Sequence, residues 1–598
     1  MLQPEPMREL TLLIPKSDER RAIEALADAK LLHVHDHERA LIQGVTIDIG
    51  TPSGDATALA DALLKTRALI MATGAEASSE PGSRTIAERI ARVKALAARV
   101  AEHERTIADA QARLAALRQR ATLLSSLPPV EGEVRALAVS RTVAGILVEN
   151  ASEPVMRAMA LEDPVARIDA PDGRTLLVVR KADLAATVAR LKSCGATTDD
   201  LAPLADATGT IEDAQRSTAA EIAALERRIA AERNGIADTA RHAGFLRATE
   251  RVLALELLKA QAPLRFGETR RVALIRGWVP ESRSEELLAR MRGVRHVADL
   301  TVPDDAPTLL RNPRPAKGFE ALLAMYSLPR YREIDPTSVM AITFPVFFGF
   351  MLGDIGYGLL ILLLAFLLAR RPALRPFAEI IGISAMSAIL FGALFGELFG
   401  LGAIGAFSFP SLLHRAEDPM TLGLIALAFG VAHMNLGLLF GLVTACRKDG
   451  IAHGVISKGG WFAVEAGIAM LLLGRTAWWV PAGLGVIALA WGEGIVGIVE
   501  IPTLVTHTLS YLRLAAIGLA SVFLAVVTNT LGGGLVSGGG WGILGGSIIL
   551  IVGHSINLAL GLFGPFLHSL RLHYAEFFMK FYEGGGRPYV PFGTGVEA

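Results

Sequence analysis

Residues 501–531 form an apolar run that carries one permanent charge: Ile501-Pro-Thr-Leu-Val-Thr-His-Thr-Leu-Ser-Tyr-Leu-Arg513-Leu-Ala-Ala-Ile-Gly-Leu-Ala-Ser-Val-Phe-Leu-Ala-Val-Val-Thr-Asn-Thr-Leu531. A helix of about 20 residues is enough to cross a bilayer, so this run is long enough to span one. The guanidinium of Arg513 keeps its proton, and placing it at mid-bilayer costs at least roughly 2.5–3.5 kcal/mol. Such a group normally faces a partner charge or a water-filled path. The alternative is an arginine that reaches the interface or neutralises a structural carboxylate.

Apolar character divides the chain into two parts. Its 598 residues carry 59 acidic and 59 basic side chains, without the basic surplus that a nucleic-acid partner favours. Residues 1–335 are rich in Arg, Asp and Glu, whereas 337–583 are mostly apolar. Because no apolar signal segment opens the chain, we expect the first part to stay in the cytoplasm. Two cysteines alone cannot form a disulfide framework, which agrees with a reducing compartment.

Eight apolar runs predict a polytopic α-helical membrane domain with about eight transmembrane helices. The runs cover 337–353, 355–369, 377–401, 420–446, 456–474, 479–500, 501–531 and 541–583. The first two meet at Gly353-Asp354 and form either one bent helix or a tight pair, while the last two must be long and tilted. Eight crossings return the C-terminal tail to the side of the soluble part. Basic residues then lie on that side, as the positive-inside rule expects: Arg370, Arg371, Arg375, Arg447, Lys448, Lys580 and Arg587.

Two long helical patterns stand out in the soluble part. Segments 84–129 and 206–262 repeat apolar residues at spacings of three, four and seven among many Glu and Arg residues. This narrow apolar seam predicts an antiparallel coiled-coil stalk.

The stalk segments enclose residues 130–205, where strand-like runs at 134–140, 144–148 and 175–180 alternate with helix-like ones, so we expect a distal α/β lobe. Segments 1–83 and 263–330 each contain a strand that ends in proline, then a helix and a second strand. They are predicted to form one membrane-proximal α/β lobe. The soluble part is thus predicted to be a dumbbell, before the membrane domain at 337–583 and a cytoplasmic tail at 584–598.

Polar side chains form stripes inside the apolar half. The last run places polar and small residues along one helix face at steps of three and four: His554, Asn557, Gly561, Gly564, His568 and Arg571. The preceding run has a second stripe of Thr503, Thr506, Ser510 and Arg513, and further upstream Glu493, Glu500 and His507 recur every seven residues. Other ionisable groups in this half are Asp354, Glu397, His433 and Glu465.

Acidic and basic groups that alternate through one bundle favour a proton or cation route. For Asp354 and Glu397, beside glycines at possible helix ends, a locally satisfied carboxylate is an equally good interpretation. The sequence contains no phosphate-binding loop and no zinc-ligand spacing, so we predict no cofactor and no metal site.

Several motifs resemble one known family. They are Thr506-His-Thr-Leu-Ser-Tyr-Leu-Arg-Leu514, Leu567-His-Ser-Leu-Arg-Leu-His-Tyr-Ala-Glu-Phe-Phe578, Lys580-Phe-Tyr-Glu-Gly-Gly-Gly-Arg-Pro-Tyr-Val-Pro-Phe592 and Phe344-Pro-Val-Phe-Phe-Gly-Phe-Met-Leu-Gly-Asp-Ile-Gly-Tyr-Gly358. The chain resembles the membrane stator subunit of rotary V-type and A-type ATPases, called subunit a in the eukaryotic pump and subunit I in prokaryotic V/A-type ATP synthases. Both the dumbbell and the eight-helix membrane domain suit that family.

The resemblance implies roles for individual residues. Arg513 matches the family's essential arginine, which faces the ion-carrying carboxylate of a rotating proteolipid ring, and Arg571 matches its second arginine, supported by His568. Glu500 falls where the family has an acidic residue of the cytoplasmic half-channel. Asp354, Glu397 and His433 resemble residues of the opposite half-channel. The remaining residues assigned to ion translocation are Glu493, His507, Ser510, His554 and Asn557.

The resemblance also implies the setting and the partners. The expected complex lies in a prokaryotic cell membrane and transports protons or sodium, and this chain has no ATP-hydrolysing site of its own. Expected partners are the proteolipid ring, the peripheral stalks, a central-stalk connecting subunit and membrane lipid.

Two positions depart from the eukaryotic pattern: Gly561 stands where that pattern has Glu, and Ser521 where it has His. We therefore expect the counter-charge of Arg513 on another subunit. A secondary ion transporter and a membrane scaffold with a coiled-coil cytoplasmic domain are the alternative functions.

Overall fold

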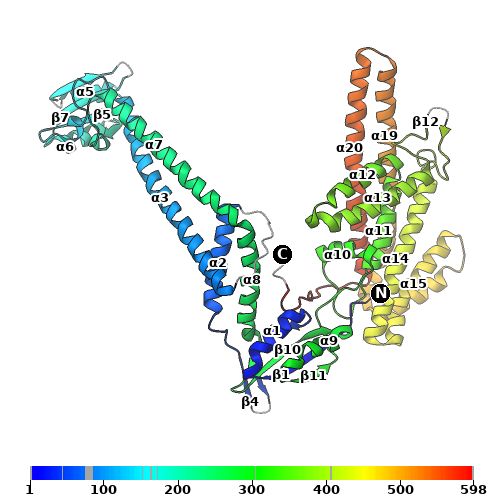
Figure 1. Cartoon of the computed structure of the whole chain (residues 1–598). Helices are drawn as coiled ribbons and strands as arrows, with labels where there is room; N and C mark the ends of the chain where they lie inside the picture. The colour runs from blue at the N-terminus through cyan, green and yellow to red at the C-terminus, as the bar shows by residue number, and fades with distance from the viewer. Residues whose placement is uncertain are drawn as a thin grey trace. The chain divides into compact units, whose positions relative to one another are not determined.

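A computed structural model describes residues 3–594, except 39, 43–44, 75–84, 151–152, 162–163, 171–172, 304 and 405–406. The chain divides into two compact units (Figure 1). Unit 1 contains the described residues of Met1–Asp48 and Phe266–Thr594, and unit 2 those of Ile49–Arg265. The domain boundaries proposed from the sequence divide the chain more finely than this and stay a prediction.

Unit 1 begins with a sheet built from both ends of the soluble sequence. Its strand order is β11-β1-β10-β9-β4-β3, and β2 also pairs with β10. The strands are β1 (Met7–Pro15), β2 (His33–Val34), β3 (Ala40–Ile42), β4 (Val45–Ile49), β9 (Gly267–Glu268), β10 (Val272–Pro280) and β11 (Val297–Thr301). Met7 faces Pro280 and Pro15 faces Val272 in the antiparallel pair of β1 and β10. The two proline-ended strands are therefore direct neighbours, and the helices that follow them, α1 (Glu19–Ala29) and α9 (Ser284–Arg290), are also in contact.

Unit 2 contains two long helices that pack antiparallel, α3 (Ile86–Ser126) and α7 (Ile211–Asp238). Threonine caps begin both helices, since Thr85 and Thr210 each accept a hydrogen bond from a backbone N–H three residues on. Their seam buries Ala110, Leu114 and Ile229. An ion pair and a hydrogen bond flank the seam, with Arg118 at 2.8 Å from Glu226 and Nδ1 of His103 at 2.6 Å from Glu232. Whether the pair supercoils stays a prediction.

The second long helical pattern is interrupted. A 3-10 turn at Thr239–His242 separates α7 from α8 (Ala243–Gln261). Beyond this turn α8 packs mainly on α2 (Ala56–Thr73), where Leu253 is buried with Leu59 and Leu63. The apolar spacing alone does not reveal this exchange of packing partner.

A four-stranded sheet lies between α3 and α7 in sequence, with the order β6-β7-β5-β8. Its elements are β5 (Val143–Val148), α5 (Glu153–Leu161), β6 (Ala166–Asp169), β7 (Thr175–Arg180), α6 (Leu184–Ser193) and β8 (Thr198–Asp200). The strand expected at 134–140 is wrong, because the chain forms a helical turn there, α4 (Ala136–Val139). Alanine and leucine favour that turn, and Val134 packs against Leu123 and Leu124 at the end of α3.

The apolar half of unit 1 is helical. Its helices are α11 (Thr337–Leu352), α12 (Ile355–Leu368), α13 (Arg375–Phe395), α14 (Pro419–Asp449), α15 (Ile451–Leu472), α16 (Trp479–Gly492), α17 (Gly494–Val499), α18 (Ile501–Leu509), α19 (Leu512–Ser537) and α20 (Trp541–Arg571). Five helical stretches of the described chain are long and apolar enough to cross a membrane: Pro372–Phe395, Pro419–Lys448, Ile451–Leu472, Gly494–Ser537 and Trp541–Lys580. Because α11, α12 and α16 are shorter, the count of eight crossings stays a prediction. Helices α19 and α20 lie side by side as a long hairpin (Figure 1).

The first two apolar runs form two helices. Gly353 ends α11 in a left-handed conformation (φ +41°), which suits glycine. Asp354 then caps α12 by accepting the backbone N–H of Tyr357 at 3.0 Å. A bent single helix is thereby excluded.

The chain after α20 returns to the sheet of unit 1. The Tyr589 hydroxyl donates to the Leu31 carbonyl, and the Phe592 N–H donates to the Leu32 carbonyl at 2.7 Å. Glu583 accepts from Arg330 at 2.7 Å. The tail thus joins the end of α20 to the segment that follows α1.

Candidate functional site

Two arginines meet where α18, α19 and α20 adjoin. Helix α18 ends at Leu509, and α19 restarts at Leu512, so Arg513 lies in the first turn of α19. Arg571 is the last residue of α20, and the charges of Arg513 and Arg571 act on each other and on His568. Nη1 of Arg513 is buried without a hydrogen-bond partner among the described residues. A buried guanidinium nitrogen without a hydrogen bond costs free energy. This atom is therefore suited to bind an acceptor from outside the described chain.

A carboxylate that the sequence analysis did not assign joins these arginines. Oε1 of Glu576 lies 3.9 Å from Nε of Arg571, and the Glu576 side chain is 3% exposed. Glu576 also interacts electrostatically with Arg513, and its Oε2 is buried without a hydrogen-bond partner in the described part of the chain. The stretch Leu572–Phe577 is a π-helix, whose i to i+5 spacing brings residues 571 and 576 together. On an α-helix they would lie on different faces, so the helical spacing concealed this pair.

A second cluster buries two histidines behind the arginines. Nδ1 of His433 on α14 hydrogen-bonds the hydroxyl of Tyr511 at 2.7 Å, in the break before α19. His573 donates through Nδ1 to the Ser569 carbonyl at 2.7 Å and contacts the Thr343 hydroxyl through Nε2 at 2.7 Å. The rings of His433 and His573 are 4.9 Å apart. This cluster therefore connects α14, α11 and the π-helix to Tyr511, two residues before Arg513.

Two predicted site residues are each satisfied locally: Asp354 lies in the break between α11 and α12, and Glu397 lies just after α13. Asp354 accepts backbone N–H groups of Tyr357, Phe399 and Gly400 at 2.8–3.0 Å. Glu397 forms a two-pronged ion pair with Arg415, whose side chain is 1% exposed. Of the two interpretations left open by the sequence, this geometry favours the local one.

Arg415 also binds the end of α11. It donates to the carbonyls of Met351, Leu352 and Gly353 at 2.9–3.3 Å, and it lies 4.7 Å from the Phe395 ring centroid. A cation at the C-terminus of a helix is favoured by the helix dipole. Nothing local in the sequence indicates these contacts, because the partners of Arg415 at the end of α11 lie far away in the chain.

A polar chain runs through the α19–α20 hairpin. The Tyr357 hydroxyl lies 2.6 Å from Nδ1 of His554, and Nε2 of His554 lies 3.0 Å from Oδ1 of Asn529. Asn557 donates to the Ser521 carbonyl and accepts from its hydroxyl at 3.0–3.2 Å. His554 and Asn557 thus both face α19, where their partners are Asn529 and Ser521, respectively.

The upstream acidic residues form a separate cluster with two lysines. Nζ of Lys458 lies 2.7 Å from Oε1 of Glu493. Lys580 lies 5.4 Å from the ring centroid of Trp461 and interacts electrostatically with Glu500, Glu493 and His507. Trp461 thus contacts both Glu493 and Lys580, and the two lysines were missed because they come from other helices.

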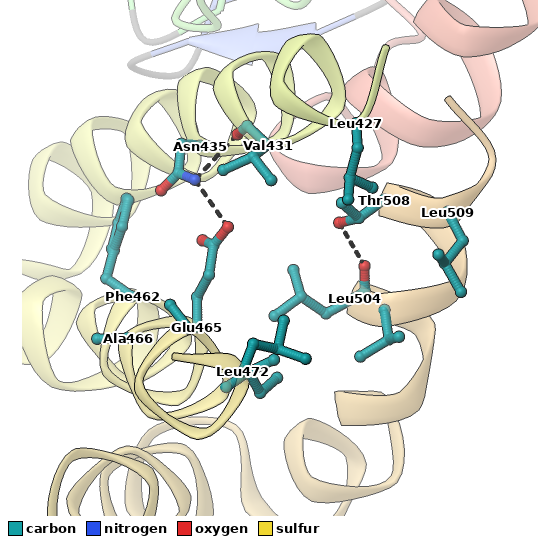
Figure 2. A pocket seen from close by; sticks show the side chains of 13 residues that line it. Leu427, Val431, Asn435, Phe462, Glu465, Ala466, Leu472, Leu504, Thr508 and Leu509 are labelled. Carbon is teal, nitrogen blue, oxygen red and sulfur yellow. Dashed lines mark hydrogen bonds between the residues drawn. The ribbon is translucent and has the colours of Figure 1, made fainter. Parts of the chain in front are cut away.

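Glu465 lies apart from these groups. It contributes to the wall of a largely apolar pocket of about 440 Å³ between α14, α15 and α18 (Figure 2). Its Oε1 accepts from Asn435 at 2.8 Å. The opposite wall contains Leu504 and Thr508, and the Thr508 hydroxyl bonds the Leu504 carbonyl within its own helix (Figure 2).

Comparison with known proteins finds one family to which the chain is similar. The family model described as the V-type ATPase 116 kDa subunit family matches residues 259–376 and 500–594, which include Arg513, Arg571 and Glu576. The chain resembles this family over both segments. The A-type ATP synthase subunit I of Halobacterium salinarum is 30% identical over 471 residues, covering 59% of this chain and 65% of the relative. That of Archaeoglobus fulgidus is 33% identical over 425 residues, covering 58% and 62%.

With several helices long and apolar enough to cross a membrane, and with its similarity to A-type ATP synthase subunit I, the chain is a multi-pass membrane protein. It spans less than two thirds of the length of these curated relatives. A solved structure of the cytoplasmic N-terminal domain of subunit I, a homolog of subunit a of V-ATPase, covers 49% of this chain at 17% identity. The TM-score of this structural match is 0.28.

Proposed function

We propose that this chain is the membrane stator subunit of a rotary V/A-type ATPase or ATP synthase. In this role it forms two half-channels for protons, or for sodium, against a rotating proteolipid ring. The observation that carries the proposal is Arg513, a fixed charge in an apolar helix whose buried Nη1 has no partner among the described residues. An ionised carboxylate on a neighbouring subunit would satisfy that atom and would stay charged beside it.

The ring carboxylate releases its ion near Arg513 and takes up another before it turns toward lipid. Rotation is directed because a charged carboxylate is too costly to expose to the hydrocarbon. Arg513 itself exchanges no proton, since its guanidinium stays charged. Arg571 and His568 support it from α20.

The polar clusters suggest how the two half-channels divide. The cytoplasmic half-channel is formed by the cluster of Glu493, Glu500 and His507 with Lys458 and Lys580. This cluster lies at helix ends that have basic residues before or after them, as expected on the cytoplasmic side. The chain of Tyr357, His554 and Asn529, with Asn557, supplies the opposite half-channel. Asp354 and Glu397 stabilise the wall of that half-channel through local partners, and His433 stabilises the α18–α19 break.

The soluble part and the tail belong on the cytoplasmic side in this proposal. The antiparallel pair of α3 and α7 resists torque and connects this subunit to the peripheral stalks. The central-stalk connecting subunit is a further partner. ATP hydrolysis belongs to other subunits of the complex.

Site-directed cross-linking in native membranes tests this function. A cysteine at Ala516, exposed one turn after Arg513, should cross-link to a ring subunit in a chain whose Cys194 and Cys446 are replaced by serine. A cysteine at Leu363, 55% exposed on α12, is the control and should not. The chain should also co-purify with ring, stalk and nucleotide-binding subunits. A chain that purifies without them would favour a secondary transporter or a scaffold instead.

A further inference from the structure

The arginine site carries its own carboxylate, and the charge count at the site depends on it. Arg513 and Arg571 bring two guanidinium groups to the junction of α19 and α20, and Glu576 brings one carboxyl group beside Arg571. When that carboxyl is ionised, the site keeps a single net positive charge. This inference rests on the proposed function, because it concerns how that charge meets the ring.

The geometry shows that Glu576 is shared rather than fully paired. Its Oε1 is 3.9 Å from Nε of Arg571, longer than a hydrogen bond, and its Oε2 is buried without a partner among the described residues. Nη1 of Arg513 is likewise buried without a hydrogen-bond partner among the described residues. Glu576 and Arg513 are thus each left with one buried bonding atom that is unused.

Other titratable groups around Glu576 do not cancel this charge. His568 faces both arginines, Tyr511 interacts with Glu576, and His433 and His573 lie behind with their rings against Phe577. Lys580, on the turn after Glu576, interacts with Glu500 and Glu493 in the other cluster. Glu576 is therefore the carboxylate of this cluster that acts on both arginines.

We propose that Glu576 is the resident counter-ion of Arg513 and Arg571, a positioning residue that holds the site at one net positive charge so that a single ring carboxylate neutralises it. Without Glu576 the two guanidiniums would repel each other in a low-dielectric site and bind the incoming carboxylate too strongly. With Glu576 the ring carboxylate is held weakly enough to take up its next ion. The π-helix keeps the carboxylate in place, because it brings residue 576 alongside residue 571.

The test removes the charge of Glu576 without removing its shape. In the assembled complex in vesicles, Glu576→Gln should shift the alkaline limb of the ATP-driven pumping curve to lower pH by about one unit, since protonating a ring carboxylate beside a doubly positive site requires more acid. Glu576→Asp should keep the wild-type curve to within a few tenths of a unit. Glu379→Gln, an exposed carboxylate paired with Arg375 on α13, is the matched control and should not shift it.

A double variant distinguishes charge from structure. Glu576→Gln with Arg571→Gln restores one net positive charge, so its alkaline limb should return toward the wild-type position even if its rate is lower. A wild-type curve for Glu576→Gln, or a double variant as acid-shifted as the single one, would overturn the proposal. If Glu576→Gln does not assemble, restored assembly of the double variant supports the charge balance, and failed assembly overturns it. Normal pumping by Arg513→Ala would overturn the proposed function itself, which separates the two failures.

Discussion

The hydroxyl of Tyr511 lies 2.7 Å from Nδ1 of His433, and the rings of Phe347 and Phe577 pack against this pair. Tyr511 is fully buried two residues before Arg513, in the break between α18 and α19. The hydrogen bond therefore fixes the start of α19 to α14. It determines where the essential charge of the proposed mechanism is held.

Removing this hydroxyl should destabilise the membrane domain. Tyr511→Phe leaves Nδ1 of His433 buried without its partner, which costs about 1–3 kcal/mol, and we expect a lower melting temperature of the purified complex in detergent. The double variant Tyr511→Phe/His433→Leu should lose less than the two single variants combined, because both polar groups are then gone. Equal stability of Tyr511→Phe and the wild type would contradict this role for the pair.

The ion pair of Arg415 and Glu397 should be structural. Glu397→Gln leaves a buried guanidinium without its counter-charge and is expected to cost about 3–5 kcal/mol, seen as loss of assembled complex. Replacing both residues by apolar ones, Arg415→Met/Glu397→Leu, should recover part of the assembly. Normal assembly of Glu397→Gln together with loss of pumping would instead indicate that Glu397 conducts ions.

Close helix packing at Gly392 should not tolerate a methyl group. A Cβ there would lie 2.5 Å from the Ile355 nitrogen and 2.6 Å from the Asp354 carbonyl carbon, which are backbone atoms. Gly392→Ala should therefore separate α13 from the start of α12 at a cost of about 1–3 kcal/mol. Gly382→Ala on the same helix is the control, since its nearest atom is the Ala365 Cβ at 3.7 Å. Equal melting temperatures for the two variants would refute this packing argument.

Glu19 should make the sheet of unit 1 less stable as the pH rises. Burial and the neighbouring Glu268 raise the pKa of Glu19 from 4.5 to about 7. Since the folded-state pKa is the higher one, the stabilisation is complete below about pH 4.5 and is lost as the pH rises through about 7. Hydrogen exchange of β1 and α1 in the full chain should show about 1–2 kcal/mol less protection at pH 8 than at pH 5, with allowance for solvent screening.

Glu19→Gln removes the titrating group and should flatten this pH dependence. Glu24→Gln on the exposed face of the same helix, where Glu24 pairs with Arg20, should leave it unchanged. A pH dependence that survives in Glu19→Gln would show that another group is responsible.

Local patterns predicted the elements well where one periodicity dominates. Apolar runs located the membrane helices because such helices are apolar on most faces, and the glycine and aspartate at 353–354 marked the α11–α12 break without deciding its form. The similar proline-ended strands of β1 and β10 proved to be neighbours in one sheet. The run at 134–140 failed because its few strand-forming residues pack against the end of α3 instead.

The site was less predictable, because its partners come from distant segments or from irregular helix. Stripes of period 3.6 singled out Arg513, Arg571, His554 and Asn557 as candidates, but they could not indicate Glu576, which the π-helix brings beside Arg571. The expectation that the counter-charge of Arg513 lies on another subunit stays a prediction, and Glu576 adds an internal carboxylate at the same site. Likewise nothing local indicates that Arg415 binds the carbonyls at the end of α11.

The most direct test of the central claim is ATP-driven ion transport by the reconstituted complex carrying Arg513→Ala. Arg371→Ala, an exposed arginine after α12, is the control, and ring co-purification verifies assembly of both. We predict that Arg513→Ala assembles with the ring but loses transport, while Arg371→Ala transports normally. An assembled Arg513→Ala complex that pumps at the wild-type rate would contradict the account.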